Sequence, residues 1–237
     1  MTGRLLLCLT LLALLLIPAS AEETEQPALA AVLTETAPLR ALPAADTAVL
    51  AELPEGTALS VTALGSSFCT AVWVQEGAPV TGYVALGSLR FDVAGEGEAC
   101  IGIVDVSPTN QYHGRVTLRE KASTKSRSLT RLPKGALVLV LGEEKGMKRV
   151  ALPGFTGYVT RKHIASVKAV ETTLVYVNND APVSLRLDSR YGEQWVIKTL
   201  EAGTPVQLIR NPNGWAQVEA AGYRGRMVAE YLSEEKP

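Results

Sequence analysis

Apolar and polar residues alternate in short runs along most of the chain, which is the pattern of half-buried β-strands. Residues 147–152 and 215–218 alternate large apolar with polar side chains, as antiparallel strands with one solvated face do. Residues 136–141 and 204–209 are rich in Val, Leu and Ile and predict two further strands. The sequence Asn-Pro-Asn-Gly at 211–214 predicts a hairpin turn. Beyond the N-terminal segment no helical periodicity lasts for ten residues, so the chain is predicted to be all-β.

The same landmarks recur in three consecutive stretches of the chain. A Leu-Arg pair opens each stretch, and sixteen or seventeen residues after its arginine comes a glycine that ends a tight turn. A large apolar side chain follows twelve residues later, and a second glycine opens the last strand. These four landmarks are Arg40, Gly56, Phe68 and Gly82; then Arg119, Gly135, Met147 and Gly157; then Arg186, Gly203, Trp215 and Gly225. The two glycines are 26 residues apart in the first copy and 22 in the others, which predicts an insertion at a hairpin tip.

Each repeat is too short to build a second layer, so its sheet must bury its apolar face by curling on itself into a small barrel. Units of this size are marginally stable alone, and contacts between neighbours would stabilise them. The predicted division of the chain is a signal peptide at 1–21, a spacer at 22–31, a first domain at 32–92, a linker at 93–103, a second domain at 104–168 and a third domain at 169–237.

The N-terminal segment has the layout of a secretory signal peptide. Arg4 precedes an apolar run at 5–17, Pro18 ends the run, and Ala-Ser-Ala at 19–21 supplies a cleavage site. The apolar run has thirteen residues, short of the ~20 that span a bilayer. We therefore expect a secreted protein with no transmembrane segment after cleavage, although an uncleaved anchor remains the alternative.

Cleavage at this site would remove Cys8 and leave two cysteines in the mature chain, Cys69 and Cys100. In an oxidising compartment they either form one disulfide or remain as two free thiols.

The second repeat opens with Arg-Val-Thr-Leu-Arg-Glu-Lys-Ala-Ser-Thr-Lys-Ser at 115–126, which resembles the opening of the bacterial SH3-like (SH3b) domain. Gly-Trp-Ala-Gln-Val at 214–218 is similar to the Gly-Trp-x-x-Val strand of that family, and the Tyr-Leu ending at 231–232 is also similar. Met147 and Phe68 stand where the family usually has Trp. The resemblance implies three tandem SH3-like β-barrels of the non-catalytic kind that accompanies peptidoglycan hydrolases on the cell wall or recognises peptide cross-bridges.

Catalytic motifs are absent from the sequence. Its two histidines, His113 and His163, have neither metal-ligand nor triad-like spacing with Cys69 or Cys100. No nucleophile elbow, phosphate-binding glycine loop or His-Glu-x-x-His stretch is present. We expect no enzymatic activity, no cofactor and no metal.

The charge is distributed unevenly although the chain as a whole carries only −1. Residues 113–168 hold thirteen Lys or Arg against three Asp or Glu, a net charge of +10, whereas 32–92 carry −4 and 169–237 carry −2. Such a field attracts an anionic polymer with salt-sensitive affinity. Wall teichoic acid or anionic lipid head groups suit an exported protein better than nucleic acid does. The candidate patch is Arg115, Arg119, Lys121, Lys125, Arg127, Arg131 and Lys134. A solvated face, or pairing with the acidic first domain, is the alternative.

Aromatic residues offer a second candidate site, because exposed rings supply rigid contact area for a peptide or sugar. The candidate ligand groove consists of Trp215, Tyr223, Tyr191, Trp195 and Tyr158. The alternative is that these rings fill the cores of their own barrels or seal their open ends.

Together these observations predict an exported, non-catalytic protein whose SH3-like modules bind cell-wall or cell-envelope material, either peptidoglycan peptide or teichoic acid. The alternative is an extracytoplasmic scaffold or sensor for protein–protein interaction, in which the basic domain docks another envelope protein.

Overall fold

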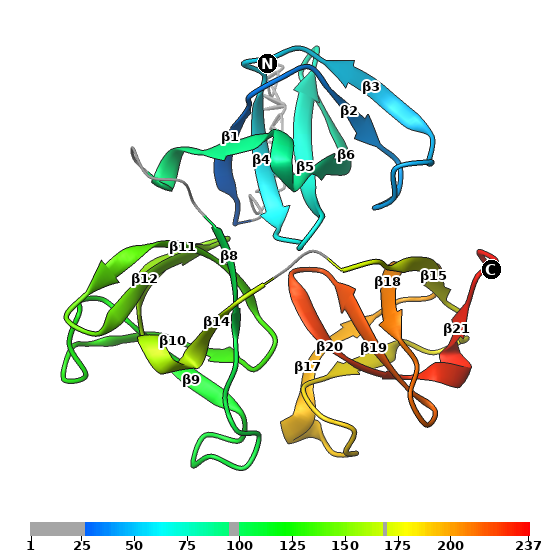
Figure 1. Ribbon diagram of the computed structural model, residues 1–237. Helices are drawn as coiled ribbons and strands as arrows, with labels where there is room; N and C mark the ends of the chain where they lie inside the picture. Colours follow the sequence, from blue (N-terminus) through cyan, green and yellow to red (C-terminus); the bar gives the residue numbers. More distant parts are fainter. Residues whose placement is uncertain (1–26, 95–99, 168–169) are drawn as a thin grey trace, which may run out of the picture.

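The computed structural model describes residues 27–94, 100–167 and 170–237 of the 237-residue chain (Figure 1). Within these ranges the regular elements are β-strands and single turns of 3-10 helix. Three seven-stranded antiparallel sheets follow one another along the chain, and each forms a separate curled module. The structure therefore confirms the predicted all-β fold with three tandem units. The predicted signal peptide at 1–21 lies outside the described residues.

Each module consists of seven strands, and corresponding strands follow one another in the same sequence in all three modules. The first module holds β1 Leu29–Leu33, β2 Ala37–Arg40, β3 Val49–Leu53, β4 Ala58–Ala63, β5 Phe68–Gln75, β6 Ala78–Ala85 and β7 Leu89–Phe91. The second holds β8 Cys100–Val104, β9 Arg115–Arg119, β10 Ser128–Pro133, β11 Leu137–Glu144, β12 Met147–Leu152, β13 Phe155–Thr160 and β14 Ile164–Ser166. The third holds β15 Thr173–Val177, β16 Val183–Arg186, β17 Val196–Leu200, β18 Pro205–Arg210, β19 Trp215–Ala220, β20 Tyr223–Val228 and β21 Leu232–Ser233.

The sheet order in the first module is β3-β2-β6-β5-β4-β1-β7, and the other two modules repeat it. The short 3-10 turns are η1 Leu86–Ser88, η2 Asp92–Ala94, η3 Arg161–His163, η4 Glu193–Trp195 and η5 Ala229–Tyr231. In each module one such turn, namely η1, η3 or η5, leads directly into the last strand, so the three units share even this detail.

The recurring landmarks lie in contact within each module. A Cβ on Gly157 would lie 2.5 Å from the carbonyl oxygen of Arg119, and Gly82 and Gly225 are similarly close to Arg40 and Arg186. Only glycine lets the two strands approach so closely at this point. The turn glycines Gly56, Gly135 and Gly203 have φ of 82°, 87° and 74°, as predicted for tight turns that require a positive φ.

The insertion in the first module lengthens its central hairpin. Strands β5 and β6 have eight residues each, whereas β12, β13, β19 and β20 have six. Glu76 and Gly77 at the tip both have positive φ, as a two-residue hairpin turn requires.

The predicted linker at 93–103 is wrong in its second half, because residues 100–104 form strand β8. This strand pairs with β11 and with β14 of the second module. Ile101 and Val104 on it are buried, which fixes it in the sheet. The spacer at 22–31 likewise contains the start of β1 at Leu29. Both strands precede the Leu-Arg landmark that opens each repeat, so the predicted domain limits begin too late.

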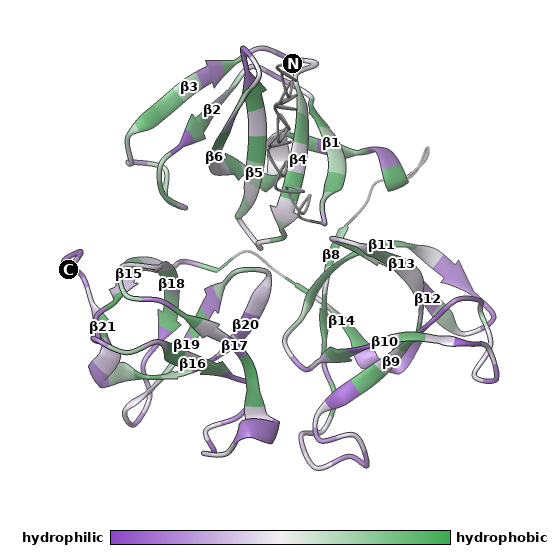
Figure 2. Cartoon of the chain, turned by 180° about the vertical axis from the view of Figure 1, so that it is seen from behind, coloured by the Kyte–Doolittle hydropathy of each residue, from purple (hydrophilic) through white to green (hydrophobic). Residues whose placement is uncertain are grey.

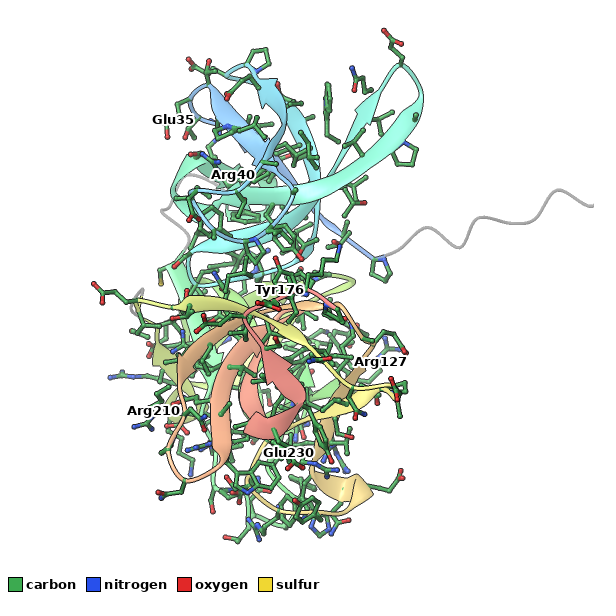
Figure 3. All side chains as sticks on the ribbon, turned by 90° about the vertical axis from the view of Figure 1, so that its right-hand side faces the viewer. Glu35, Arg40, Arg127, Tyr176, Arg210 and Glu230 are labelled. Carbon is green, nitrogen blue, oxygen red and sulfur yellow. The ribbon has the colours of Figure 1, made fainter. Side chains whose placement is uncertain are left out.

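The three modules pack around a common centre (Figure 1). The β19–β20 hairpin of the third module reaches into this centre, where Leu137 N donates to Gly222 O (2.9 Å) and Arg224 N to Gly135 O (2.8 Å) of the second module. The third module meets the first through Gln207, whose Nε2 donates to Pro43 O at 2.9 Å. Tyr176, labelled in Figure 3, is buried at the boundary between these two modules.

The second module meets the first through apolar side chains. Ile101, Leu137 and Leu139 of the second module join the core of the first module rather than their own. Figure 2 shows that hydrophobic residues are concentrated in the strands of the three sheets and that many loops between the strands are hydrophilic. The predicted stabilisation by neighbouring modules therefore has a physical basis in these shared contacts.

Candidate binding groove of the second module

A ten-residue loop, residues 105–114, connects β8 to β9 and forms one wall of a groove on the second module. The side chain of Asn110 holds this loop in shape. Its Oδ1 accepts hydrogen bonds from the backbone amides of Tyr112 (3.0 Å) and Gly114 (2.8 Å), and its Nδ2 donates to Arg115 O (2.9 Å). One side chain thus satisfies three main-chain groups, which fixes the wall before any ligand arrives.

The floor of the groove is strand β9. Val116 and Leu118 point into the core, while Arg115, Thr117 and Arg119 alternate toward the groove. The ring of Tyr112 lines the groove and lies under the guanidinium of Arg131, which is 4.4 Å from the ring centroid. This cation–π contact holds both side chains at the edge of the groove.

The opposite wall is the loop at 120–127. Arg119 Nη1 donates to Ser126 O at 2.7 Å and so ties this loop to the floor. Arg40 does the same with Thr47 O in the first module and Arg186 with Gly192 O in the third. In all three modules the arginine of the Leu-Arg pair therefore holds the following loop in place by a hydrogen bond to one of its carbonyl oxygens.

Three cations of the 120–127 loop remain at the surface: Lys121, Lys125 and Arg127 (Arg127 is labelled in Figure 3). The ion pair of Arg127 with Glu120 is long, 3.9 Å, and its side chain is 74% exposed. A pair of this kind contributes little to stability, so the positive charge remains available to a ligand.

The groove has a volume of about 390 Å³ and no carboxylate among its lining residues. The lining residues are Val106, Ser107, Asn110, Gln111, Tyr112, Arg115, Val116, Thr117, Arg119, Thr124, Val159, Thr160 and His163. Burial, and next the charge of Lys162, lower the pKa of His163 below its ordinary value, so its imidazole is neutral at neutral pH. Two arginines surrounded by amide, hydroxyl and imidazole groups suit a ligand that is both anionic and rich in hydrogen-bonding atoms.

Comparisons with known proteins give no assignment. No family model matches the chain, and no curated protein matches it. Among solved structures, NlpC2 from Trichomonas vaginalis is 17% identical over 59% of this chain and 49% of that chain, with a TM-score of 0.25. NlpC1 from the same organism is 10% identical over 93% of this chain and 99% of that chain, also with a TM-score of 0.25. The chain thus spans about half the length of NlpC2, and TM-scores this low carry no conclusion about fold or function.

The seven predicted patch residues do not form one surface. Arg115 Nη1 donates to Gln194 O (3.0 Å) and its Nη2 to Val196 O (3.2 Å), so this groove residue also docks the third module. Lys134 lies outside the groove lining, where its Nζ contacts Asp105 Oδ1 at 2.9 Å. The remaining five, Arg119, Lys121, Lys125, Arg127 and Arg131, lie on the groove or on the two elements beside it.

The predicted aromatic groove is wrong as a single site, because the structure distributes its five residues over several surroundings. Tyr191 and Trp215 pack edge to face with centroids 5.4 Å apart. Trp195 is only 8% exposed and lies under Arg190, 3.9 Å from its ring centroid. Tyr223 packs between the cores of the second and third modules, and the Tyr158 hydroxyl donates to Glu144 Oε2 at 3.2 Å.

Both cysteines are free, so the disulfide left open by the sequence is not formed in the structure. Cys69 is buried in the first module, and burial raises the pKa of its thiol to about 12. Cys100 is exposed on β8. Within the described ranges no three His, Cys, Asp or Glu side chains gather as metal ligands. None of the helices in these ranges is long and apolar enough to cross a membrane.

Asn110, Tyr112 and the groove role of His163 were not predicted from the sequence. The sequence does contain a feature that could have indicated Asn110 and Tyr112, namely the length of the loop that carries them. The second module places ten residues between its first strand and the strand that carries Leu-Arg, against three in the first module and five in the third. A long loop inserted into one repeat of three is a frequent location of function.

Proposed function

We propose that this chain is an exported, non-catalytic binding protein that holds an anionic polymer of the cell envelope on its second module. The observation that supports this most is the groove beside β9, which contains Arg115 and Arg119 but no carboxylate. The loop next to it adds Lys121, Lys125 and Arg127 in a module with a net charge of +10 over residues 113–168. Wall teichoic acid, a phosphodiester polymer rich in hydroxyls, has the matching chemistry.

The proposal includes the identity of the modules as SH3-like domains. The Leu-Arg pair of residues 115–126, the stretch that resembles the opening of that family, lies where the sheet of the second module closes tightly, because a Cβ on Gly157 would lie 2.5 Å from Arg119 O. The family resemblance supports an extracellular location and attachment to the cell wall, in agreement with the segment at 1–21 that resembles a signal peptide.

A non-catalytic role is supported by the titratable groups of the groove. His163 is the one histidine of the lining, and neither cysteine lies in it. Cys69, with a pKa raised to about 12 by burial, remains a protonated thiol and does not supply a nucleophile.

The proposal is tested by removing three charges from the groove loop and the same number elsewhere. The variant Lys121→Gln/Lys125→Gln/Arg127→Gln is compared with Lys198→Gln/Arg210→Gln/Lys236→Gln, which removes three exposed cations from the third module. Binding to purified teichoic acid is measured across a salt series. We expect the first variant to bind more weakly and with a smaller salt dependence, and the second to bind like the natural protein. Equal behaviour of the two variants would refute the proposal.

A further inference from the structure

A cavity of about 400 Å³ lies between the second and third modules, separate from the groove. Pro108 of the 105–114 loop lines this inter-module cavity, while Asn110 and Tyr112 of the same loop line the groove. The polar side chains of the cavity are Asp105 and Lys134 from the second module and Asp188, Gln217, Arg224 and Arg226 from the third.

Three cations and two carboxylates line the cavity, and most are already paired. Lys134 bonds to Asp105, and Arg224 Nη2 donates to Glu219 Oε2 at 2.9 Å. Asp188 accepts a hydrogen bond from Arg190 Nε at 2.9 Å. For Arg226, the part of the chain that the structure describes offers neither a hydrogen bond nor an ion pair to its side chain. The lining therefore has one net positive charge and one guanidinium available to a ligand.

The carboxylate of Asp188 is ionised at neutral pH. Burial opposes ionisation, but the hydrogen bond from Arg190 and the positive charges of Arg190 and Arg226 outweigh it and lower the pKa of Asp188. Asp188 thus remains an acceptor for hydroxyl groups and repels a ligand with closely spaced negative charges.

An aromatic pair, Trp215 and Tyr191, lies on the side of the β19–β20 hairpin that also carries Gln217 and Arg226. Gln217 pairs with Arg226, and Trp215 lies two residues before Gln217, so its side chain points to the same side of the sheet. The ring of Tyr191 packs against Trp215 and is 72% exposed. The two rings are inclined by 60°, so a ligand that enters the cavity along this face would meet the exposed ring of Tyr191 first and the guanidinium of Arg226 next.

We propose that the inter-module cavity binds a short acidic oligosaccharide. Its carboxylate would pair with Arg226, its hydroxyls would donate to Asp105 and Asp188 and bond to Gln217, and one sugar ring would lie on the Tyr191–Trp215 pair. A sugar fits better than an acidic peptide because a single negative charge among many hydroxyl donors matches a lining of one free cation and two acceptors. This site is independent of the polymer groove and of the function proposed for it.

The test is calorimetric titration of the full-length protein with an aldotetraouronic acid, a xylotriose that carries one glucuronic acid and hence one carboxylate, and with its methyl ester, a neutral molecule of nearly the same size. We expect the acid to bind at least about tenfold more tightly than the ester. Arg226→Gln should weaken binding of the acid by about tenfold and leave that of the ester unchanged. Trp215→Ala should weaken both about fivefold, because the ring contact does not depend on charge. The control Arg149→Gln removes an exposed arginine of β12 and should change neither, with circular dichroism reporting that each variant folds.

Three results would overturn the proposal: no binding of either saccharide, equal binding of acid and ester, or full binding by Arg226→Gln. Tighter binding of a capped tetrapeptide with one glutamate than of the aldotetraouronic acid would also overturn it, and would assign the cavity to an acidic peptide. The groove variants at Lys121, Lys125 and Arg127 leave this cavity intact, so failure here and failure of the polymer site are distinguished.

Discussion

The backbone amide of Ser66 donates a 2.6 Å hydrogen bond to Oε1 of Glu219, although 153 residues separate the two along the chain. Ser66 belongs to the first module and Glu219 to the third. The same carboxylate accepts from Arg224 Nη2 at 2.9 Å through its other oxygen. Glu219 is 3% exposed and the Arg224 side chain 14%, so this ion pair is buried where the modules meet.

Replacing Glu219 should therefore destabilise the whole assembly. Glu219→Ala leaves the Arg224 guanidinium buried without its partner and the Ser66 amide without its acceptor, at a cost of about 3–5 kcal/mol in the free energy of unfolding. Urea denaturation followed by tryptophan fluorescence measures the loss. Glu201→Ala, an exposed residue in the β17–β18 turn, serves as the control and should change stability by no more than about 0.5 kcal/mol. Similar midpoints for the two variants would show that the junction contributes little.

Two turn glycines that occupy the same place in their modules should respond differently to alanine. A Cβ added to Gly56, whose φ is 82°, would have no atom within 4 Å, whereas a Cβ on Gly135 would lie 1.9 Å from Arg224 O. Gly56→Ala should cost about 1–2 kcal/mol, the strain of a positive φ alone. Gly135→Ala should cost about 2 kcal/mol more, because the third module must move away. Thermal unfolding of both variants, monitored by circular dichroism, makes the comparison; equal losses would contradict the observed contact.

This pair of glycines also illustrates what the sequence could predict. The repeats, strands and turns were predictable because all three modules have the same backbone geometry. This geometry requires the same residue types at the same places in each module. The Leu-Arg pair and the strand glycine recur because the strand glycine packs against the backbone of this pair. The turn glycine recurs because the backbone at its position has a positive φ.

The packing between modules was not predictable, because it uses outward positions that differ from copy to copy. Four residues after the turn glycine stand Ser60, Leu139 and Gln207. Ser60 is exposed, Leu139 joins the core of the first module, and Gln207 is buried by its bond to Pro43. The alternation of inward and outward side chains along a strand predicts that all three residues face outward. It does not predict which of them is covered by another module. The single aromatic groove failed for the same reason, since Tyr223 and Trp195 are covered at the junction of the second and third modules.

Cys69 and Cys100 should differ in reactivity. In folded protein that begins at Glu22, a thiol reagent at about pH 8 should modify only the exposed Cys100 quickly. Cys69 is buried and protonated, so it should react only when the protein unfolds. Addition of urea should release the second thiol. Cys100→Ser should show no fast reaction. A count of zero thiols in urea without reductant would mean instead that the two cysteines are bridged.

Binding to the groove should strengthen on acidification. The pKa of His163 is lowered by burial and by Lys162, so the imidazole is neutral at about pH 7.5 and gains a proton only below its ordinary range. The imidazolium then adds positive charge to the lining. Titration of a phosphodiester polymer, whose own charge is constant over this range, at about pH 7.5 and about pH 5 should show the gain. His163→Gln should abolish it and His113→Gln, on the exposed part of the loop, should retain it; a gain that survives His163→Gln would assign the effect to another group.

Protonation of His163 also links pH to stability. The pKa of His163 is lower in the folded than in the unfolded state. The contribution of neutral His163 to stability is therefore fully present above the unfolded-state pKa and is lost as the pH falls through the folded-state pKa. The ligand should therefore raise the free energy of unfolding more at acidic pH than at neutral pH, because it binds the groove with protonated His163 more tightly.

The most direct test of wall binding through the basic groove is retention of a protein comprising residues 22–237 on purified peptidoglycan sacculi, with and without teichoic acid, across a salt series. Binding through the basic groove predicts retention that weakens steadily with salt and disappears when teichoic acid is removed. Retention that survives high salt on teichoic-acid-free sacculi would assign binding to the peptide stem and contradict the groove as the principal site. Absence of retention under every condition would contradict wall binding altogether and favour a protein partner.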